Sequence, residues 1–204
     1  MITDADRTRI ANAIRVAETK TSGEIFCVLA HNAGAYRLMP IAWAAVMALI
    51  VPIPLILLTE WEAKTVYVLQ LLAFILASIG LSRPAIRFRI VPRSMKRERA
   101  HGAAVRQFLA QGMQKTERRT GVLIFAAVAE RYVEIIADGG INARVTQAVW
   151  DNAVASLIAA IKAGRPGDGF VAAIEQCGAV LAEHFPVAPG SVNPDELPDK
   201  LVEI

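Results

Sequence analysis

Two long stretches without a charged side chain constrain this chain more than any other feature of its sequence. Neither residues 38–58 nor residues 65–82 include an Asp, Glu, Lys or Arg, and only Gln70 interrupts the apolar surface of the second stretch. A helix rises about 1.5 Å per residue, so a hydrocarbon core of about 30 Å requires about 20 residues, with about 17 to 25 tolerated. Residues 40–58 and 66–82 are therefore predicted to form two transmembrane helices.

A pair of buried helices in the core of a soluble domain is the alternative interpretation. It requires the rest of the chain to cover both helices on all sides, and a protein of 204 residues with 54% hydrophobic residues leaves too little polypeptide for that. A cleaved signal peptide would lie close to the N-terminus, whereas residues 1–37 form an amphipathic, polar segment. We therefore expect both helices to remain in the mature protein.

The distribution of basic residues predicts the orientation of this hairpin. Arg37 precedes the first helix, and the loop between the helices carries Glu60 and Glu62 against Lys64. The segment after the second helix carries one acid, Glu98, and seven basic residues: Arg83, Arg87, Arg89, Arg93, Lys96, Arg97 and Arg99. Because basic flanks favour the cytoplasmic side, we expect a multi-pass protein of the cell (inner) membrane with both termini in the cytoplasm.

The same seven residues dominate the charge of the protein and indicate its partners. With Glu98 they carry a net charge of +6, and the whole chain carries +3, so the remainder carries −3. This distribution argues against nucleic acid as a partner of the globular part. The basic side chains are predicted to contact anionic lipid headgroups, at about 1 kcal/mol each.

The rest of the chain has the periodicities of a small α/β domain. A capping box between Thr3 and Asp6 predicts a first helix, which a buried strand over residues 23–30 follows. After the hairpin, we predict a helix over residues 97–117 and two strands, 121–129 and 132–137, joined by a short turn. Asn142 and Asp168 are expected to cap the last two helices.

A strand, a helix and a second strand form a right-handed crossover with parallel strands, whereas the short turn joins antiparallel strands. The sequence therefore predicts a three-layer α/β/α sandwich with a small mixed sheet, interrupted by a two-helix transmembrane hairpin. The hairpin occupies residues 39–82. Residues 1–38 and 83–186 form the two parts of the domain, and residues 187–204 form an irregular tail in which Leu197, Leu201 and Ile204 are able to dock.

The two cysteines, Cys27 and Cys177, lie far apart and on apolar faces of predicted elements. Their spacing is not that of a metal site. We interpret them as buried thiols in a reducing compartment.

Several segments together resemble the TPM domain. They are TSGEIFCVL, ERRTGVLIFAAVAERYVEIIADGGI, VTQAVWDNAV and the GDGFVAAIEQCG stretch. The resemblance implies a compact α/β/α sandwich, and it associates the chain with calcium binding, acid phosphatase activity and the assembly or repair of membrane complexes. TPM domains usually follow a signal peptide and precede a C-terminal membrane span. A hairpin inside the domain therefore makes this chain look like a divergent branch of the family.

Ligands of open α/β sheets bind beyond the carboxyl ends of parallel strands, which draws attention to His31, Asn32 and Glu130. Asp138 is a further candidate, although it ends the antiparallel strand and lies nearer the opposite edge. Oxygen ligands from Asp138, Glu130 and Asn32 are able to hold calcium, while turn formation and solvation are the simpler roles for these side chains.

The residues favour an interaction module over an enzyme. The sequence has no Cys-Arg loop, Asp-x-Asp pair, phosphate-binding Gly-rich loop or His-rich cluster for phosphoryl chemistry. We expect a membrane-tethered interaction or assembly module, with a calcium-linked phosphatase as the alternative. In the second helix, Gln70, Ala73, Ala77 and Gly80 offer a surface for another membrane protein or, more simply, for packing within the hairpin.

Overall fold

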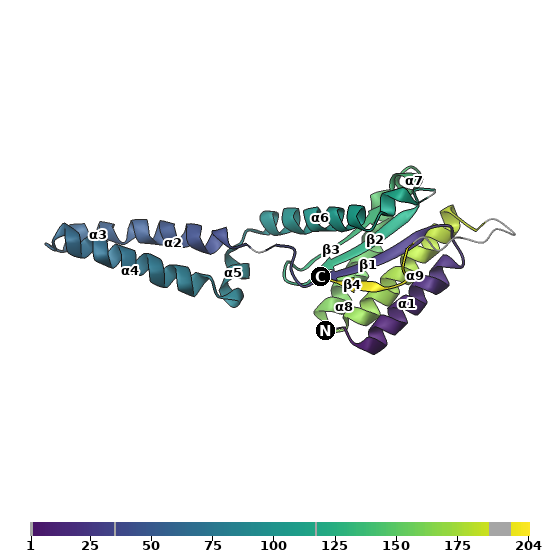
Figure 1. Cartoon of the computed structure of the whole chain (residues 1–204), viewed down its shortest axis with the longest axis horizontal. Coiled ribbons are helices and arrows are strands. Elements are labelled where there is room, and N and C mark those ends of the chain that lie inside the picture. Colours follow the sequence, from purple (N-terminus) through teal and green to yellow (C-terminus); the bar gives the residue numbers. More distant parts are fainter. Residues whose placement is uncertain (1, 35, 117, 188–196) are drawn as a thin grey trace. The chain divides into compact units, whose positions relative to one another are not determined.

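The computed structural model describes residues 2–34, 36–116, 118–187 and 197–204 (Figure 1). The chain divides into two compact units. One consists of residues 1–33 and 97–204, and the other consists of residues 34–96.

A small mixed sheet lies at the centre of the first unit. Its strands are β1 (Glu24–Ala30), β2 (Gly121–Ala127), β3 (Tyr132–Ala137) and β4 (Leu201–Glu203), in the order β3-β2-β1-β4. β1 pairs with β2 in parallel over its whole length, and β2 pairs with β3 in an antiparallel hairpin. The predicted crossover, hairpin and mixed sheet are therefore confirmed.

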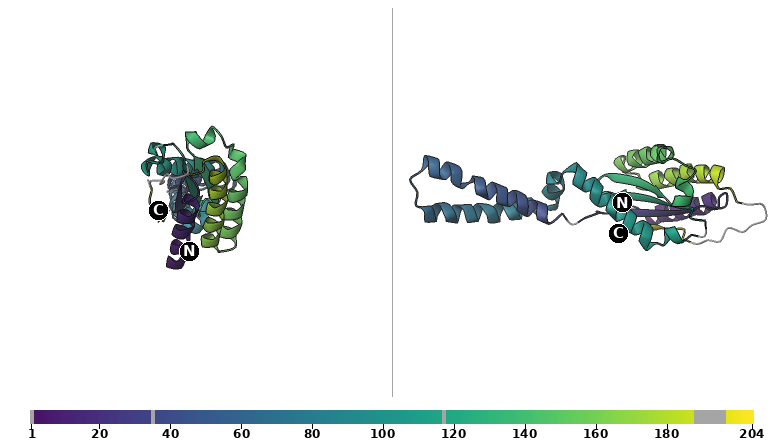
Figure 2. Two further views of the ribbon diagram at one scale, coloured as in Figure 1. Left: turned by 90° about the vertical axis from the view of Figure 1, so that its right-hand side faces the viewer. Right: turned by 90° about the horizontal axis from the view of Figure 1, so that it is seen from above.

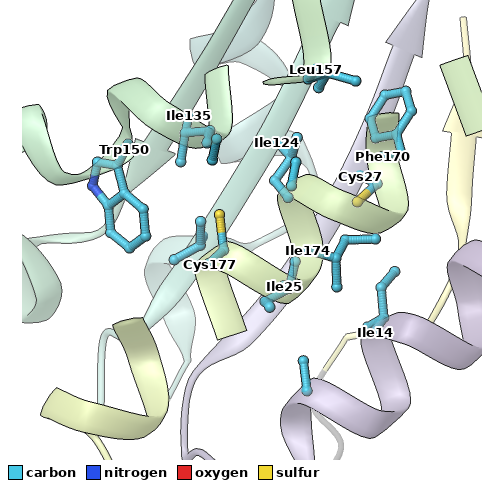
Figure 3. Close-up of a cluster of buried hydrophobic side chains, with 14 of the residues drawn as sticks. Ile14, Ile25, Cys27, Ile124, Ile135, Trp150, Leu157, Phe170, Ile174 and Cys177 are labelled. Carbon is cyan, nitrogen blue, oxygen red and sulfur yellow. The ribbon is translucent and has the colours of Figure 1, made fainter. Parts of the chain in front are cut away.

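Three helices cover one face of the sheet: α1 (Asp4–Glu18), α8 (Asp151–Lys162) and α9 (Pro166–His184). Alternate residues of the strands point into this layer, as the two-residue period of a strand requires. The largest side chains of this core are Trp150 and Phe170, and Figure 3 shows them beside Ile124, Ile174 and other aliphatic side chains. Cys27 and Cys177 lie in the same core with no exposed surface and no disulfide, as predicted.

Helix α6 (Arg93–Ala110) covers the other face of the sheet, opposite α8 and α9 (Figure 2). Its buried side chains are mostly small, Ala100, Ala103 and Ala104, with Phe108 at the end. Small residues let the helix lie close to the aromatic side chains Phe26 and Phe125 of the strands. The unit is therefore a three-layer α/β/α sandwich.

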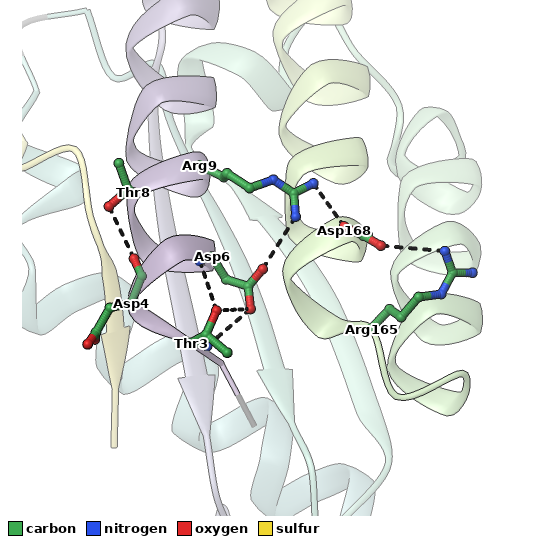
Figure 4. Close-up of polar contacts among 7 residues, drawn as sticks. All are labelled: Thr3, Asp4, Asp6, Thr8, Arg9, Arg165 and Asp168. Carbon is green, nitrogen blue, oxygen red and sulfur yellow. Dashed lines mark hydrogen bonds and ion pairs between the residues drawn. The ribbon is translucent and has the colours of Figure 1, made fainter.

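Polar contacts fix α1 against α9 at the start of the domain (Figure 4). The predicted capping box is present: Asp6 N–H donates to Thr3 Oγ1 over 3.1 Å, and Thr3 N–H donates to Asp6 Oδ2 over 3.1 Å. The hydrogen bonds from Thr3 lower the pKa of the Asp6 carboxyl. Arg9 then reaches across to Asp168, with Nη2 2.8 Å from Oδ1. Arg9 Nη1 also lies 3.4 Å from Asp6 Oδ1, so the cap helps to position an ion pair between two helices.

Several predicted helix boundaries are wrong. α6 begins before residue 97 and ends at Ala110, and a short 3-10 turn, η1 (Met113–Lys115), follows it because the left-handed Gly112 ends the helix. Asp138, rather than Asn142, is the first cap, and the helix it begins is the short α7 (Gly139–Asn142). A second 3-10 turn, η2 (Gln147–Trp150), leads directly into α8.

The cap predicted for the last helix is also wrong. α9 begins at Pro166, whose fixed φ suits the first helical position, so Asp168 lies within the first turn and its carboxylate pairs with Arg9.

The prediction of an irregular tail over residues 187–204 is wrong at its C-terminal end. Residues 201–203 form β4, which pairs in parallel with residues 27–29 of β1. The edge of β1 is buried and needs hydrogen-bond partners, and β4 supplies them. Leu201 docks in the α1 side of the core and Leu197 in the α6 side. Residues 188–196 of the predicted tail lie outside the described residues.

The second unit is a helical hairpin. It contains α2 (Leu38–Ile50), α3 (Pro52–Leu58), α4 (Ala63–Leu81) and α5 (Pro84–Ile90). Pro40, Ala44 and Ala48 recur every fourth position on α2 and are buried in the packing of the hairpin. Leu38–Leu58 and Ala63–Leu81 are long and apolar enough to cross a membrane, and only 11% and 6% of these segments is buried within the protein.

Candidate functional site

Asn32 and Glu130 lie at the edge of the sheet where β1 and β2 end, as predicted. Pairing between these strands continues past their ends, because Ala129 N–H donates to His31 O over 3.2 Å. Glu130 is only 8% exposed, and its Oε1 accepts the Ala33 N–H over 3.0 Å. Asn32 is exposed and precedes Ala33 in the loop after β1. Glu130 therefore joins the loop after β1 to the turn between β2 and β3.

Asp138 lies at the opposite end of the sheet. Because β3 is antiparallel, it leads away from Glu130, and Asp138 N–H donates to Gly121 O at the start of β2 over 2.9 Å. The Asp138 carboxylate accepts the Gly139 N–H over 2.6 Å and pairs with Arg119 Nη2 at 3.1 Å. The structure thus separates Asp138 from Asn32 and Glu130, and these three predicted calcium ligands do not form one site.

Among the described residues, no group of three or more His, Cys, Asp or Glu side chains has the geometry to hold a metal ion. Glu130 has one buried oxygen, Oε2, without a hydrogen-bond partner in the described part of the chain. One orphaned oxygen and a neighbouring amide are fewer ligands than calcium gathers.

Three polar side chains form a connected group between α6 and β3. Nδ1 of His101 lies 3.0 Å from both carboxylate oxygens of Glu134, and the Tyr132 hydroxyl donates to Glu134 Oε2 over 3.0 Å. Glu134 is largely covered, with 20% of its side chain exposed, whereas 57% of the His101 side chain is exposed. Burial raises the pKa of Tyr132 to about 12, and the charge of Glu134 acts in the same direction while Arg97 opposes it. Tyr132 therefore stays protonated and serves as a donor.

This group was not predicted from the sequence. One signal was present: Glu134 is the one acidic residue in a strand whose other side chains are apolar or aromatic, and it alternates with residues of the α8 side of the core. A carboxylate at such a position needs a partner on the covering helix. The position of His101 on the helix, close to the buried Ala100 and Ala104, does not by itself predict a contact with Glu134.

A second pair of contacts joins the end of β4 to the loop after β1. Glu203 Oε1 lies 2.7 Å from Arg7 Nη2, and Glu203 Oε2 lies 3.7 Å from Nε2 of His31. His31 N–H also donates to Ile204 O over 2.7 Å. His31, which was a candidate site residue, is thus part of the attachment of the C-terminal strand.

A carboxylate cluster lies at the other end of β1 and was also not predicted. Glu18 ends α1, and its Oε1 accepts the Ile25 N–H over 2.8 Å. Glu24 and Asp199 lie beside it, and Asp199 Oδ2 is 3.5 Å from Arg15 Nε. Burial is the largest cause that raises the pKa of Glu18, and the neighbouring Glu24 and Asp199 add to it while the hydrogen bond from Ile25 opposes it, which brings the pKa to about 9. The neighbouring Asp199 carboxylate, like burial, favours the protonated form of Glu18.

The seven basic residues predicted to contact lipid divide between the units. Arg83, Arg87, Arg89, Arg93 and Lys96 belong to the second unit, whereas Arg97 and Arg99 extend from α6 in the first. Five of them are exposed, and Arg87 and Lys96 are half-buried. The Arg87 guanidinium lies 5.2 Å from the centre of the Phe88 ring, which also makes an edge contact with Tyr36. No described acidic side chain forms a salt bridge with these seven residues.

Comparison with known proteins links part of this chain to a family. The TPM domain family model matches residues 82–180. The NMR structure of the BA42 protein from the psychrophilic bacterium Bizionia argentinensis has the same fold, with a TM-score of 0.61 and 23% sequence identity over 100% of this chain and 95% of that one. At that identity the likeness concerns the fold alone. A comparison with curated proteins gives no match. The family match, together with the three-layer sandwich, shows that this chain carries a TPM domain.

Proposed function

We propose that the chain is a multi-pass protein of the cell (inner) membrane whose TPM domain lies in the cytoplasm and acts as an interaction or assembly module. The observation that carries the proposal is the exposure of the hairpin. Its two apolar segments have 21 and 19 residues, and most of their large apolar side chains are exposed. Apolar patches of this extent are covered by lipid or by another protein.

The charge on either side of the hairpin supports the orientation. The loop at its tip carries Glu60 and Glu62, whereas the basic residues gather after α4. Anionic headgroups of the cytoplasmic leaflet attract such a segment. The buried, unpaired thiols Cys27 and Cys177 also suit a reducing compartment.

Cysteine labelling in intact cells tests both insertion and orientation. The two natural thiols have no exposed surface, so they provide a low background. We expect Glu60→Cys to react with a membrane-impermeant maleimide from outside, and Lys200→Cys to react only after the membrane is opened. The protein should also remain in the pellet after carbonate washing. Release by carbonate, or labelling of Lys200→Cys in intact cells, would contradict the proposal.

The structural roles of the predicted calcium ligands Asp138 and Glu130 support an interaction module. Asp138 caps α7, and Glu130 holds the loop after β1. The basic segment is mostly exposed and forms no salt bridge with a described acidic side chain, which suits binding to lipid and to an acidic surface of a neighbouring membrane protein. We expect the full chain to bind vesicles containing anionic lipid in preference to neutral vesicles. Replacing Arg83, Arg89 and Arg93 with Gln should remove the preference, whereas the exposed acid-to-amide change Glu183→Gln should not.

A calcium-linked phosphatase is the alternative, and the family association favours it. It predicts that the purified full chain hydrolyses a generic phosphomonoester in the presence of calcium and that Glu130→Ala abolishes the activity. It also predicts that calcium raises the unfolding temperature, because a ligand bound only to the folded state stabilises it. Activity with both properties would replace the interaction module as the function of this chain.

A further inference from the structure

The group formed by His101, Glu134 and Tyr132 has a chemistry that the proposed function does not use. A carboxylate only accepts hydrogen bonds, so the nitrogen that faces Glu134, Nδ1, must carry the proton. The neutral ring then has its lone pair on Nε2. Within the described part of the chain, Nε2 of His101 makes no hydrogen bond, and 57% of the side chain is exposed. The lone pair on Nε2 of His101 is therefore left without a hydrogen-bond partner in the described part of the chain.

The environment of Nε2 suits an anionic electrophile. Arg97 lies one helical turn before His101 on α6, so the two side chains share a face of the helix. The charge of Arg97 also acts on this group of side chains, because it acts to lower the pKa of Tyr132. A guanidinium beside a nucleophile attracts phosphoryl groups and stabilises charge that develops on them.

We propose that His101 is a phosphoryl-accepting nucleophile that Glu134 positions and Tyr132 supports. The donor is a compound with a good leaving group, an acyl phosphate or a phosphoramidate. The Nε2 lone pair attacks phosphorus and forms a P–N bond, and the bond from phosphorus to the leaving group breaks, with its electron pair departing on that group. The proton on Nδ1 remains shared with the Glu134 carboxylate, which offsets the positive charge of the ring.

The chain contains its own controls. His31 has an exposed fraction of 63%, slightly above that of His101, but its Nε2 faces Glu203. His184 is half-buried at the end of α9. If exposure decided reactivity, His31 would react at least as fast as His101. If positioning by the carboxylate decides the reactivity, His101 should react about tenfold faster than His31. A factor of about ten is the effect expected of one charge-assisted hydrogen bond.

The experiment uses the full chain in mild detergent with phosphoramidate at neutral pH, and mass spectrometry maps the modified residue over time. We expect about tenfold faster modification of His101 than of His31 and His184. Equal or slower modification of His101 would overturn the proposal. In the unmodified protein, ¹⁵N chemical shifts should show the proton of the neutral His101 ring on Nδ1, and a proton mainly on Nε2 would also overturn it.

Glu134→Gln tests the positioning role, since the amide keeps the size of the side chain and removes its charge. We expect His101 modification to slow about tenfold and the tautomer preference to weaken, while circular dichroism stays unchanged. Glu203→Gln is the matched control and should leave His101 modification unaltered. An unchanged rate and tautomer in a folded Glu134→Gln protein would refute the role of Glu134. None of these results depends on membrane orientation, so the two proposals stand or fall separately.

Discussion

Glu18 gives the protein a pH-dependent stability that a single substitution should remove. The raised pKa of Glu18, about 9 against an ordinary value of 4.5, arises first from burial and then from Glu24 and Asp199. The folded state therefore holds a proton that the unfolded chain releases. The resulting stability is fully present below about pH 4.5 and is lost as the pH rises toward about 9.

The size of this pH effect follows from the number of protons that the folded and unfolded states bind. Between these two pH values the folded state binds about one proton more than the unfolded state, so the free energy of unfolding falls by about 1.4 kcal/mol for each pH unit. From pH 6 to pH 8 the loss is about 3 kcal/mol, a large part of the roughly 5 to 15 kcal/mol of a typical domain. Glu18→Gln mimics the protonated acid, because its amide oxygen can accept the Ile25 N–H and its amide N–H can donate to Asp199.

The assay is urea unfolding of the full chain in mild detergent at several pH values. Reaction of Cys27 and Cys177 with a thiol reagent reports unfolding of this unit alone, because both thiols have no exposed surface when it is folded. We expect wild type to lose about 3 kcal/mol more than Glu18→Gln between pH 6 and pH 8. The exposed Glu183→Gln should behave as wild type. Parallel pH profiles for wild type and Glu18→Gln would refute the argument that the proton resides on Glu18.

Substitutions at three further positions, Gly178, Asp138 and Ala44, test packing and capping. Gly178→Val should cost about 1 to 3 kcal/mol in the same unfolding assay, because even a Cβ at this position would lie 2.7 Å from the Cβ of Ala17. Asp138→Ala should cost about 1 to 2 kcal/mol through loss of the α7 cap, and Asp138→Asn should recover most of it. In the hairpin, Ala44→Leu should weaken packing between α2 and α4 and lower the resistance of the hairpin to SDS, whereas Leu57→Ala on the exposed surface should not.

Local patterns predicted much of the fold. The capping box of Thr3 and Asp6 involves neighbours in the chain, and the apolar run of β1 reports burial on both faces. The parallel pairing of β1 with β2 and the antiparallel pairing of β2 with β3 follow from the lengths of their connections. These features depend on short spacings in the chain and on general rules of chain geometry, so they can be predicted directly from the sequence.

The contacts that define the candidate sites depend on distant residues. Glu134 meets His101 across 33 positions, and Asp199 reaches Glu18 only because β4 returns to the edge of β1. Three residues of β4 are too few to show a period. The predicted calcium ligands failed to converge for a related reason: Glu130 and Asp138 are close in sequence, but β3 carries them to opposite ends of the sheet.

The position of the helical hairpin between β1 and α6 also has a physical basis. An insertion between β1 and α6 lengthens the loop that must close before β1 can pair with β2, and loop-closure entropy rises by about 0.6 kcal/mol for each doubling of a flexible loop. A folded hairpin reduces the effective length, because α2 and α4 pack side by side and return the chain near its point of departure. The small stripe of Pro40, Ala44 and Ala48 that permits this packing therefore contributes to closing the sheet as well as to the hairpin itself.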